Sequence, residues 1–325
     1  MKNMVDERFE LASVIFRLAG REEYSVSDTD YQKEVAEKFA EFATHKAVEY
    51  AKGLPLGYDA VLKFAVHIEH IEIEKSDGKF IFIEDISSLF DGRWNNESAK
   101  KFLELFNDFY IDTNYAEFYN SHVPYFEEIT QNFIDETYGK IELEWFRKYI
   151  DPANLRFILS PSANGGYGAM VNDKIFYGLS EYGVWELIVQ EYYNNDNEIV
   201  EKINSGEWDY YLVLYYSGLV IVHEYCHSFA NPLAEKLYTE NPEFKKWCDD
   251  SLEGVKDKSY NSGLVVAGEY ITRACTLLYF ATHDGEFKIG EKILKYSDFI
   301  SLEKEKHENG FPYIEEVCKM LSSRA

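Results

Sequence analysis

Hydrophobic residues in the first part of the chain recur with the period of an α-helix. Residues 5–19 place large apolar side chains on one broad face before a glycine, which predicts a helix over this stretch. Asp28 or Asp30 is a suitable N-terminal cap for a second, longer helix. We expect that helix to run to Ala51, where glycine and proline follow within a few residues.

The same spacing predicts further helices over about 57–69, 96–110 and 122–149. Between the first two of these, KFIFIEDI (residues 79–86) alternates between apolar and polar positions, which is typical of a short strand. The first part of the chain is therefore expected to be mainly helical.

The pattern changes after residue 151. LRFILSP (155–161), GGYGAMV (165–171) and KIFYGLS (174–180) are short strand-like segments separated by proline, serine, asparagine and aspartate. Because the segments are consecutive and their connections are short, we predict a small antiparallel sheet.

Helical spacing returns after the predicted sheet. We expect one helix over about 181–194 and a strongly apolar one over about 208–230. The Asn231-Pro232 pair is predicted to close the apolar helix, because the residue before a proline is disfavoured in the helical region.

Three more helices follow from the same signals. One is capped by Asn241 with a proline after it, one covers 262–281, and one covers 309–320. Helices with a small sheet predict an α+β fold that is mainly helical. We divide it into a helical N-terminal region, 1–150, and a second region, 151–325.

Composition limits the possible partners. The net charge is −25 and no basic run interrupts it, so we expect no nucleic-acid partner. The longest apolar stretch, 211–222, is too short for a membrane span, and none is expected. The acidic start does not resemble a secretory signal. If Met1 is the native start, we expect a cytoplasmic protein; if a signal peptide was removed, a secreted or periplasmic one.

The segment IVHEYCHSFANP, residues 221–232, carries the candidate chemistry. His223 and His227 are four positions apart, so a helix places both imidazoles on one face, where they can bind one Zn²⁺ ion. Glu224 lies about 100° around the helix from His223 and is expected to act as general base on a metal-bound water. Burying these groups without partners would cost several kcal/mol. This cost favours a metal site over the alternatives, a solvated turn or a lapsed site.

A third metal ligand must come from another segment, because no HExxHxxGxxH extension follows His227. Glu269, in GEYITRA, begins a second apolar helix that can fold back antiparallel. Arg273 lies one turn later and can hold the second oxygen of the carboxylate. A surface Glu–Arg pair is the alternative interpretation. Glu235 and Glu253 are rival ligands.

The glycine-rich segment before the HExxH helix is a candidate substrate-binding strand. Its residues are Gly165, Gly166, Tyr167 and Gly168. An open strand edge of this kind can accept an extended peptide through backbone hydrogen bonds. A bulged strand or the start of a hairpin is the alternative.

These segments resemble a bacterial domain family of unknown function with features of the gluzincin zinc metallopeptidases. The likeness covers most of the chain and is carried by DERFELASVIFRLAG, NDFYID, FILSPSANGGYG, HEYCHSFANPL and GEYITRA. The resemblance implies a zincin-like catalytic part with an HExxH helix and a small sheet. It also implies that His223, His227 and Glu269 bind zinc, that Glu224 is the base, and that strand 165–171 holds the substrate backbone.

We therefore predict a zinc metallopeptidase, a hydrolase that acts on peptide or protein substrates. The alternative is a catalytically lapsed zincin-like scaffold that binds peptides or glycan-derived chains. His283, Tyr260, Tyr270 and Tyr279 are candidates for stabilising the transition state, and the sequence does not choose among them.

Overall fold

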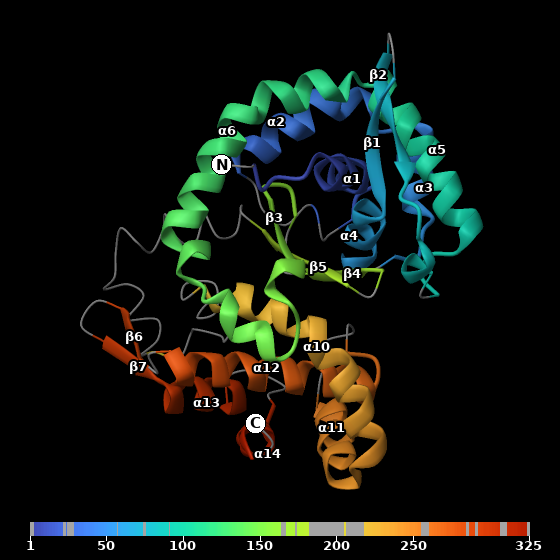
Figure 1. Cartoon of the computed structure of the whole chain (residues 1–325). Coiled ribbons are helices and arrows are strands. Elements are labelled where there is room, and N and C mark those ends of the chain that lie inside the picture. The colour runs from blue at the N-terminus through green and yellow to red at the C-terminus, as the bar shows by residue number, and fades with distance from the viewer. Residues whose placement is uncertain are drawn as a thin grey trace. The chain divides into compact units, whose positions relative to one another are not determined.

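The chain forms two compact units. The computed structural model describes residues 3–21, 24, 29–56, 58–73, 76–90, 92–163, 167–172, 174–181, 205, 218–254, 260–283, 286–289, 292–305 and 311–323. The first unit comprises Met1–Lys140 and Ala153–Glu186, and the second comprises Ile141–Pro152 and Leu187–Ala325 (Figure 1). The described residues are mainly helical with small sheets, as predicted for an α+β protein.

Helices make up most of the first unit. They are α1 (Glu7–Leu18), α2 (Asp30–Phe39), α3 (Lys46–Lys52), α4 (Tyr58–Val66), α5 (Asn96–Asp112) and α6 (Tyr115–Glu136). The prediction for α1 is confirmed. The predicted single helix to Ala51 is wrong, because a 3-10 turn (Ala40–Phe42) interrupts it and His45 caps a new helix by accepting from the amide of Ala47. The cap of α2 is Thr29, which forms a capping box with Gln32.

The predicted helix over 57–69 ends earlier than expected. The chain leaves α4 at Val66 and forms β1 (Ile68–Ile73), which pairs antiparallel with β2 (Ser76–Phe82). His67 is the residue between the end of α4 and the start of β1. Its buried imidazole has Nδ1 2.6 Å from the carbonyl oxygen of Lys63. This contact with the preceding turn satisfies the ring at the helix end.

Three further strands form a mixed sheet with the order β3-β5-β4. The strands β3 (Leu155–Ser160), β4 (Tyr167–Val171) and β5 (Ile175–Glu181) occur where they were predicted. The purely antiparallel arrangement is wrong, because β3 pairs with β5 in parallel and only β4 is antiparallel to β5. The β4–β5 turn is short, and Asn172 adopts a left-handed conformation in it (φ 54°). β3 and β4 are consecutive in the sequence but lie at opposite edges of the sheet, with β5 between them.

The sheet belongs to the first unit, which corrects the predicted boundary after residue 150. Helix α4 packs against β4. The amide of Leu159 in β3 donates to the carbonyl oxygen of Met4, 3.0 Å away, which ties the strand to the start of the chain. These contacts are distant in sequence, so a change of local pattern at residue 151 does not mark a change of unit.

The second unit is built on two long helices that pack against each other, α10 (Leu219–Glu240) and α12 (Gly263–His283) (Figure 1). The other described elements are the 3-10 segment Leu143–Lys148, α11 (Pro242–Gly254), β6 (Glu286–Ile289), β7 (Lys292–Lys295), α13 (Tyr296–Glu305) and α14 (Ile314–Ser322). The start of α11 is confirmed, because the Asn241 side chain accepts from the amides of Glu243 and Phe244, both at 3.1 Å.

Helix α10 does not end at Asn231-Pro232, so that prediction is wrong. The helix continues through Pro232 to Glu240. A proline within a helix removes one backbone hydrogen bond. Ala230, Ala234 and Leu237 remain buried on either side of it, and packing of this apolar face holds the helix together. Residues 208–217 of the predicted helix, and the whole predicted helix 181–194, lie outside the described residues.

Helix α12 is apolar for most of its length. Among the described helices it alone has the length and composition to cross a membrane, but 72% of its most apolar window is buried inside the protein. The core helix of a globular unit has the same properties, so this hydropathy is only a weak indication of a membrane segment.

A fully buried carboxyl group lies between α1 and the sheet of the first unit. Glu10 accepts hydrogen bonds from the hydroxyls of Ser160 and Tyr31, the latter at 3.3 Å. Burial raises the pKa of Glu10 to about 7, although hydrogen bonds from Ser160, Ser162 and Tyr31 oppose the shift. No cationic partner is among these groups, so the protonated form is favoured.

The raised pKa of Glu10 makes the stability of the protein depend on pH. The folded state retains a proton between about pH 4.5 and 7 that the unfolded chain releases, so this group's contribution to the free energy of unfolding falls as pH rises. The shift corresponds to roughly 3 kcal/mol at about 1.4 kcal/mol per pKa unit. Glu10→Gln should remove this dependence, which urea unfolding at about pH 5 and about pH 7.5 would measure.

The control is Glu37→Gln, which changes an exposed carboxylate on α2. We expect the stability of Glu10→Gln relative to wild type to increase by about 2 kcal/mol between the two pH values, because pH values of about 5 and about 7.5 sample most but not all of the shift. Parallel pH profiles for Glu10→Gln and wild type would contradict the assignment.

Candidate metal centre

The centre is formed where α10 and α12 pack together. Residues 219–226 of α10 are all buried, so the first histidine of the motif lies in the apolar interior. The helices approach closely at Gly268, where a Cβ atom would lie 3.0 Å from Oδ1 of Asn231. A small residue here lets the two backbones come near enough for short polar side chains to meet.

His223, His227 and Glu269 converge, as the sequence predicted. The Nε2 atom of His223 lies 3.8 Å from Oε2 of Glu269, and Nε2 of His227 lies 3.6 Å from Oε1. One ligand atom from each of the three residues lies within 4.8 Å of the other two. A tetrahedral zinc ion with bonds of about 2.0–2.1 Å separates its ligands by roughly 3.3 Å, so the group is slightly wider than a bound site.

Two buried atoms of the group lack hydrogen bonds. Among the described residues, no hydrogen bond reaches Nδ1 of His223 or Oε2 of Glu269. Burial lowers the pKa of His223 well below its usual value, with smaller contributions from His227 and Arg273. The ring is therefore neutral, which is the form that binds a metal ion. A carboxylate oxygen without a hydrogen bond, facing the neutral imidazole of His223, fits a divalent cation.

The second ring nitrogen of His227 has partners of its own. Its Nδ1 atom lies 3.1 Å from Oγ1 of Thr272 and 3.4 Å from Oδ1 of Asn231. An amide oxygen only accepts, so the contact with Asn231 requires the proton on Nδ1 and leaves the lone pair of Nε2 free toward Glu269. Thr272 and Asn231 were not predicted to support the site. Their spacing, three residues after Glu269 and four after His227, was the available signal.

Arg273 lies beside Glu269 in the interior of the second unit. Its Nε atom lies 3.3 Å from Oε2 of Glu269, and its side chain is fully buried. The alternative of a surface Glu–Arg pair is therefore excluded. The guanidinium also pairs with the buried carboxylate of Glu303, at 3.1 Å, which the sequence analysis missed.

Glu224 is buried in α10, with 6% of its surface exposed, and it is not one of the three convergent ligands. Glu224 follows His223 directly in the sequence, so its side chain leaves the helix about 100° around the axis from that of His223. Of the rival third ligands, Glu235 is exposed further along α10, and the side chain of Glu253 lies outside the described residues.

The glycine-rich strand remains a prediction as a substrate site. Gly165 and Gly166 lie outside the described residues. Tyr167 and Gly168 belong to β4, an edge strand of the first unit. A Cβ atom at Gly168 would lie 2.4 Å from the ring of Phe176, so close packing within the sheet explains this glycine.

The other candidate donors have structural partners. The hydroxyl of Tyr270 lies 2.6 Å from that of Ser251, and the hydroxyl of Tyr279 accepts from the amide of Glu142. His283 pairs with the carboxylate of Glu142 at 2.8 Å. The hydroxyl of Tyr260 accepts a hydrogen bond from Arg273 at 3.4 Å. Tyr260 therefore contacts the arginine that pairs with Glu269.

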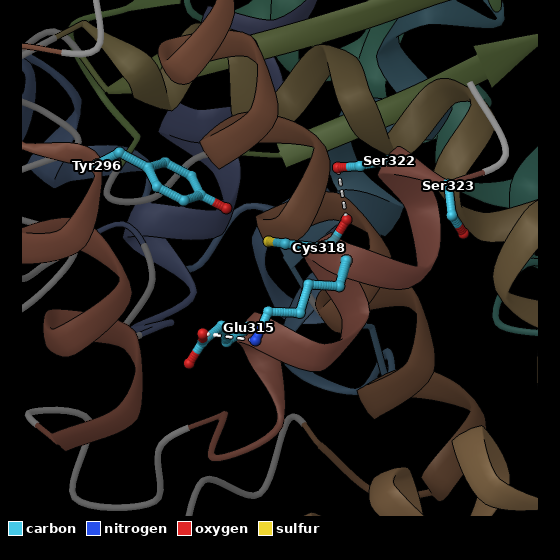
Figure 2. A pocket seen from close by; sticks show the side chains of 6 residues that line it. Tyr296, Glu315, Cys318, Ser322 and Ser323 are labelled. Atoms are coloured by element: carbon cyan, nitrogen blue, oxygen red, sulfur yellow. Dashed lines mark hydrogen bonds and ion pairs between the residues drawn. The ribbon is translucent and has the colours of Figure 1, made fainter.

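Figure 2 shows a separate pocket of about 420 Å³ beside α14, and its lining includes Tyr296, Glu315, Cys318 and Ser322. Glu315 pairs with Lys304 and with Lys319. Burial raises the pKa of Cys318 to about 12, so its thiol is not a nucleophile at neutral pH. The pocket contains none of the convergent ligands.

The convergence of three candidate ligands predicts that the purified protein binds one divalent metal ion, and Zn²⁺ is a suitable probe. Replacing either His227 or Glu269 by alanine should weaken zinc binding by more than about 100-fold, because a ligand is lost. Competition with a chromophoric chelator measures the dissociation constants.

Glu235→Ala is the matched control, since this carboxylate is a rival ligand on the same helix as His227. We expect it to leave zinc affinity unchanged. Equal affinities for Glu269→Ala and Glu235→Ala would show that Glu269 is not a ligand.

Comparison of the chain with protein-family models, with curated proteins and with solved structures gives no significant match. The function is therefore inferred from the centre itself.

Proposed function

We propose that the protein is a zinc-dependent metallopeptidase of the gluzincin type. The observation that carries the proposal is the convergence of His223, His227 and Glu269 from two helices, with a buried glutamate directly after the first histidine. Histidine and carboxylate donors in this number suit a catalytic zinc site, which leaves a coordination position open.

A zinc ion in this centre would act as a Lewis acid, lowering the pKa of water and polarising a carbonyl group. The chain supplies the remaining functions. His223 and His227 would hold the cation through ring nitrogens, and Glu269 would hold it through its carboxylate. Arg273 and Thr272 fix the orientations of Glu269 and His227 through the contacts described above.

Glu224 is assigned as the general base and acid. In peptide hydrolysis the oxygen of water adds to the carbonyl carbon, and Glu224 accepts the proton that this oxygen loses. When the carbon–nitrogen bond breaks, Glu224 returns the proton to the leaving amine. Its burial is compatible with this role, because little bulk water reaches the carboxylate.

Glu224→Gln tests the assignment, since glutamine keeps the size of the side chain and cannot accept the proton. We expect hydrolysis of a mixed peptide library, followed by mass spectrometry, to fall by about 10²–10⁴-fold. Zinc affinity should remain within about threefold of wild type, because Glu224 is not a ligand.

Glu235→Gln is the control on the same helix and should hydrolyse the library at the wild-type rate. If the zinc-loaded wild type and Glu224→Gln cleave nothing, but both retain peptides, the protein is a binding module. If the two hydrolyse equally, Glu224 is not the base.

A further inference from the structure

We propose that Glu303 is a positioning residue of the metal centre, which acts through Arg273 to keep the charge of Glu269 available for the cation. The inference rests on the proposed metal site. It concerns a carboxylate more than thirty positions from the nearest ligand, in the C-terminal part of the chain.

The guanidinium of Arg273 is enclosed on every side. Its Nη1 donates to both carboxylate oxygens of Glu303, at 3.1 and 3.3 Å, and its Nη2 donates to the hydroxyl of Tyr260. The ring of Phe311 covers one face, 4.4 Å from the guanidinium carbon. Only Nε faces Glu269, at 3.3 Å. The stronger contacts of Arg273 are thus made with Glu303.

Charge balance gives Glu303 its role. Arg273 and Glu303 are both fully buried, so neither is neutralised by water. Without Glu303, the only carboxylate paired with Arg273 among the described residues would be Glu269. A buried arginine would then compete with a cation for that carboxylate and repel the cation. With Glu303 present, the Arg273–Glu303 pair is neutral, and the negative charge of Glu269 remains available.

The geometry of the pair also fixes the position of Glu269. Glu303 lies in the last turn of α13, and the backbone amide of Phe311 donates to its carbonyl oxygen at 3.0 Å. The carboxylate and the covering ring therefore come from one short C-terminal segment. A planar guanidinium held by two carboxylate oxygens and one ring has a fixed orientation, and its Nε lies 3.3 Å from Oε2 of Glu269 as an ion pair without a hydrogen bond.

Glu303→Gln removes the charge and keeps the shape. We expect its zinc dissociation constant to rise about 10- to 100-fold, the range found when outer partners of ligands are lost. Glu303→Asp keeps the charge and should recover most of the affinity. Glu315→Gln is the matched control in the same C-terminal segment, since Glu315 pairs with lysines at the surface, and its affinity should equal that of wild type.

A double-mutant cycle distinguishes positioning from general support of the fold. In an Arg273→Met background, Glu303→Gln should change zinc affinity by less than about threefold, because Glu303 has lost the group through which it acts. The visible spectrum of the cobalt-loaded protein gives a second readout. It should change in Glu303→Gln and remain as in wild type for Glu315→Gln.

The outcomes separate this inference from the proposed function. A wild-type protein that binds no zinc overturns the metal site itself. A wild type that binds zinc, together with Glu303→Gln of equal affinity and spectrum, overturns only the role of Glu303. If Glu303→Gln does not fold, the zinc affinities of Glu303→Asp, Arg273→Met and Arg273→Met/Glu303→Gln are compared instead. If Glu303→Gln still lowers zinc affinity in the Arg273→Met background, the inference is contradicted.

Discussion

The close packing of α10 against α12 is the constraint on which the candidate centre depends. Histidine and glutamate side chains are short, so their donors meet only if the two helix backbones approach closely. Gly268 permits this approach, and Asn231 occupies the space that a side chain there would need. The same approach lets Thr272 on α12 contact His227 on α10. One packing interaction thus sets both the ligand positions and the orientation of a ligand ring.

Charge in the interior follows from this packing. The two helices bring a carboxylate, two imidazoles and an arginine into a region with little water, where unpaired charges are costly. Two features reduce this cost of unpaired charge. Burial keeps His223 neutral, and the carboxylate of Glu303 pairs with Arg273. What remains is one carboxylate, with an oxygen that accepts no hydrogen bond among the described residues, beside two imidazole nitrogens. A divalent cation could bind to this group of three side chains.

Local rules predicted the parts of the site that lie within one turn of a helix. The spacing of His223 and His227 follows from the helical period, and the position of Arg273 after Glu269 follows from the same period. Glu303 was missed because its partner is thirty residues away and no local pattern marks it. The end of α10 was misplaced because Pro232 is unfavourable locally, whereas packing with α12 outweighs the loss of one hydrogen bond. The order of the three strands depended on a connection between distant edges, which periodicity does not encode.

A comparison of the buried Glu10 with the half-buried Glu269 shows what distinguishes a candidate ligand from a structural acid in this chain. Glu10 has only hydroxyl partners, and burial raises its pKa to about 7, so a proton can satisfy it. Glu269 instead lies beside two imidazole nitrogens and has the Arg273 guanidinium 3.3 Å from its Oε2. Both residues follow the same apolar helical pattern in the sequence. The difference is the positive charge supplied by Arg273, which also pairs with Glu303. The half-buried position of Glu269 is therefore compatible with the proposed ligand role through Glu303, which is not one of the three convergent residues.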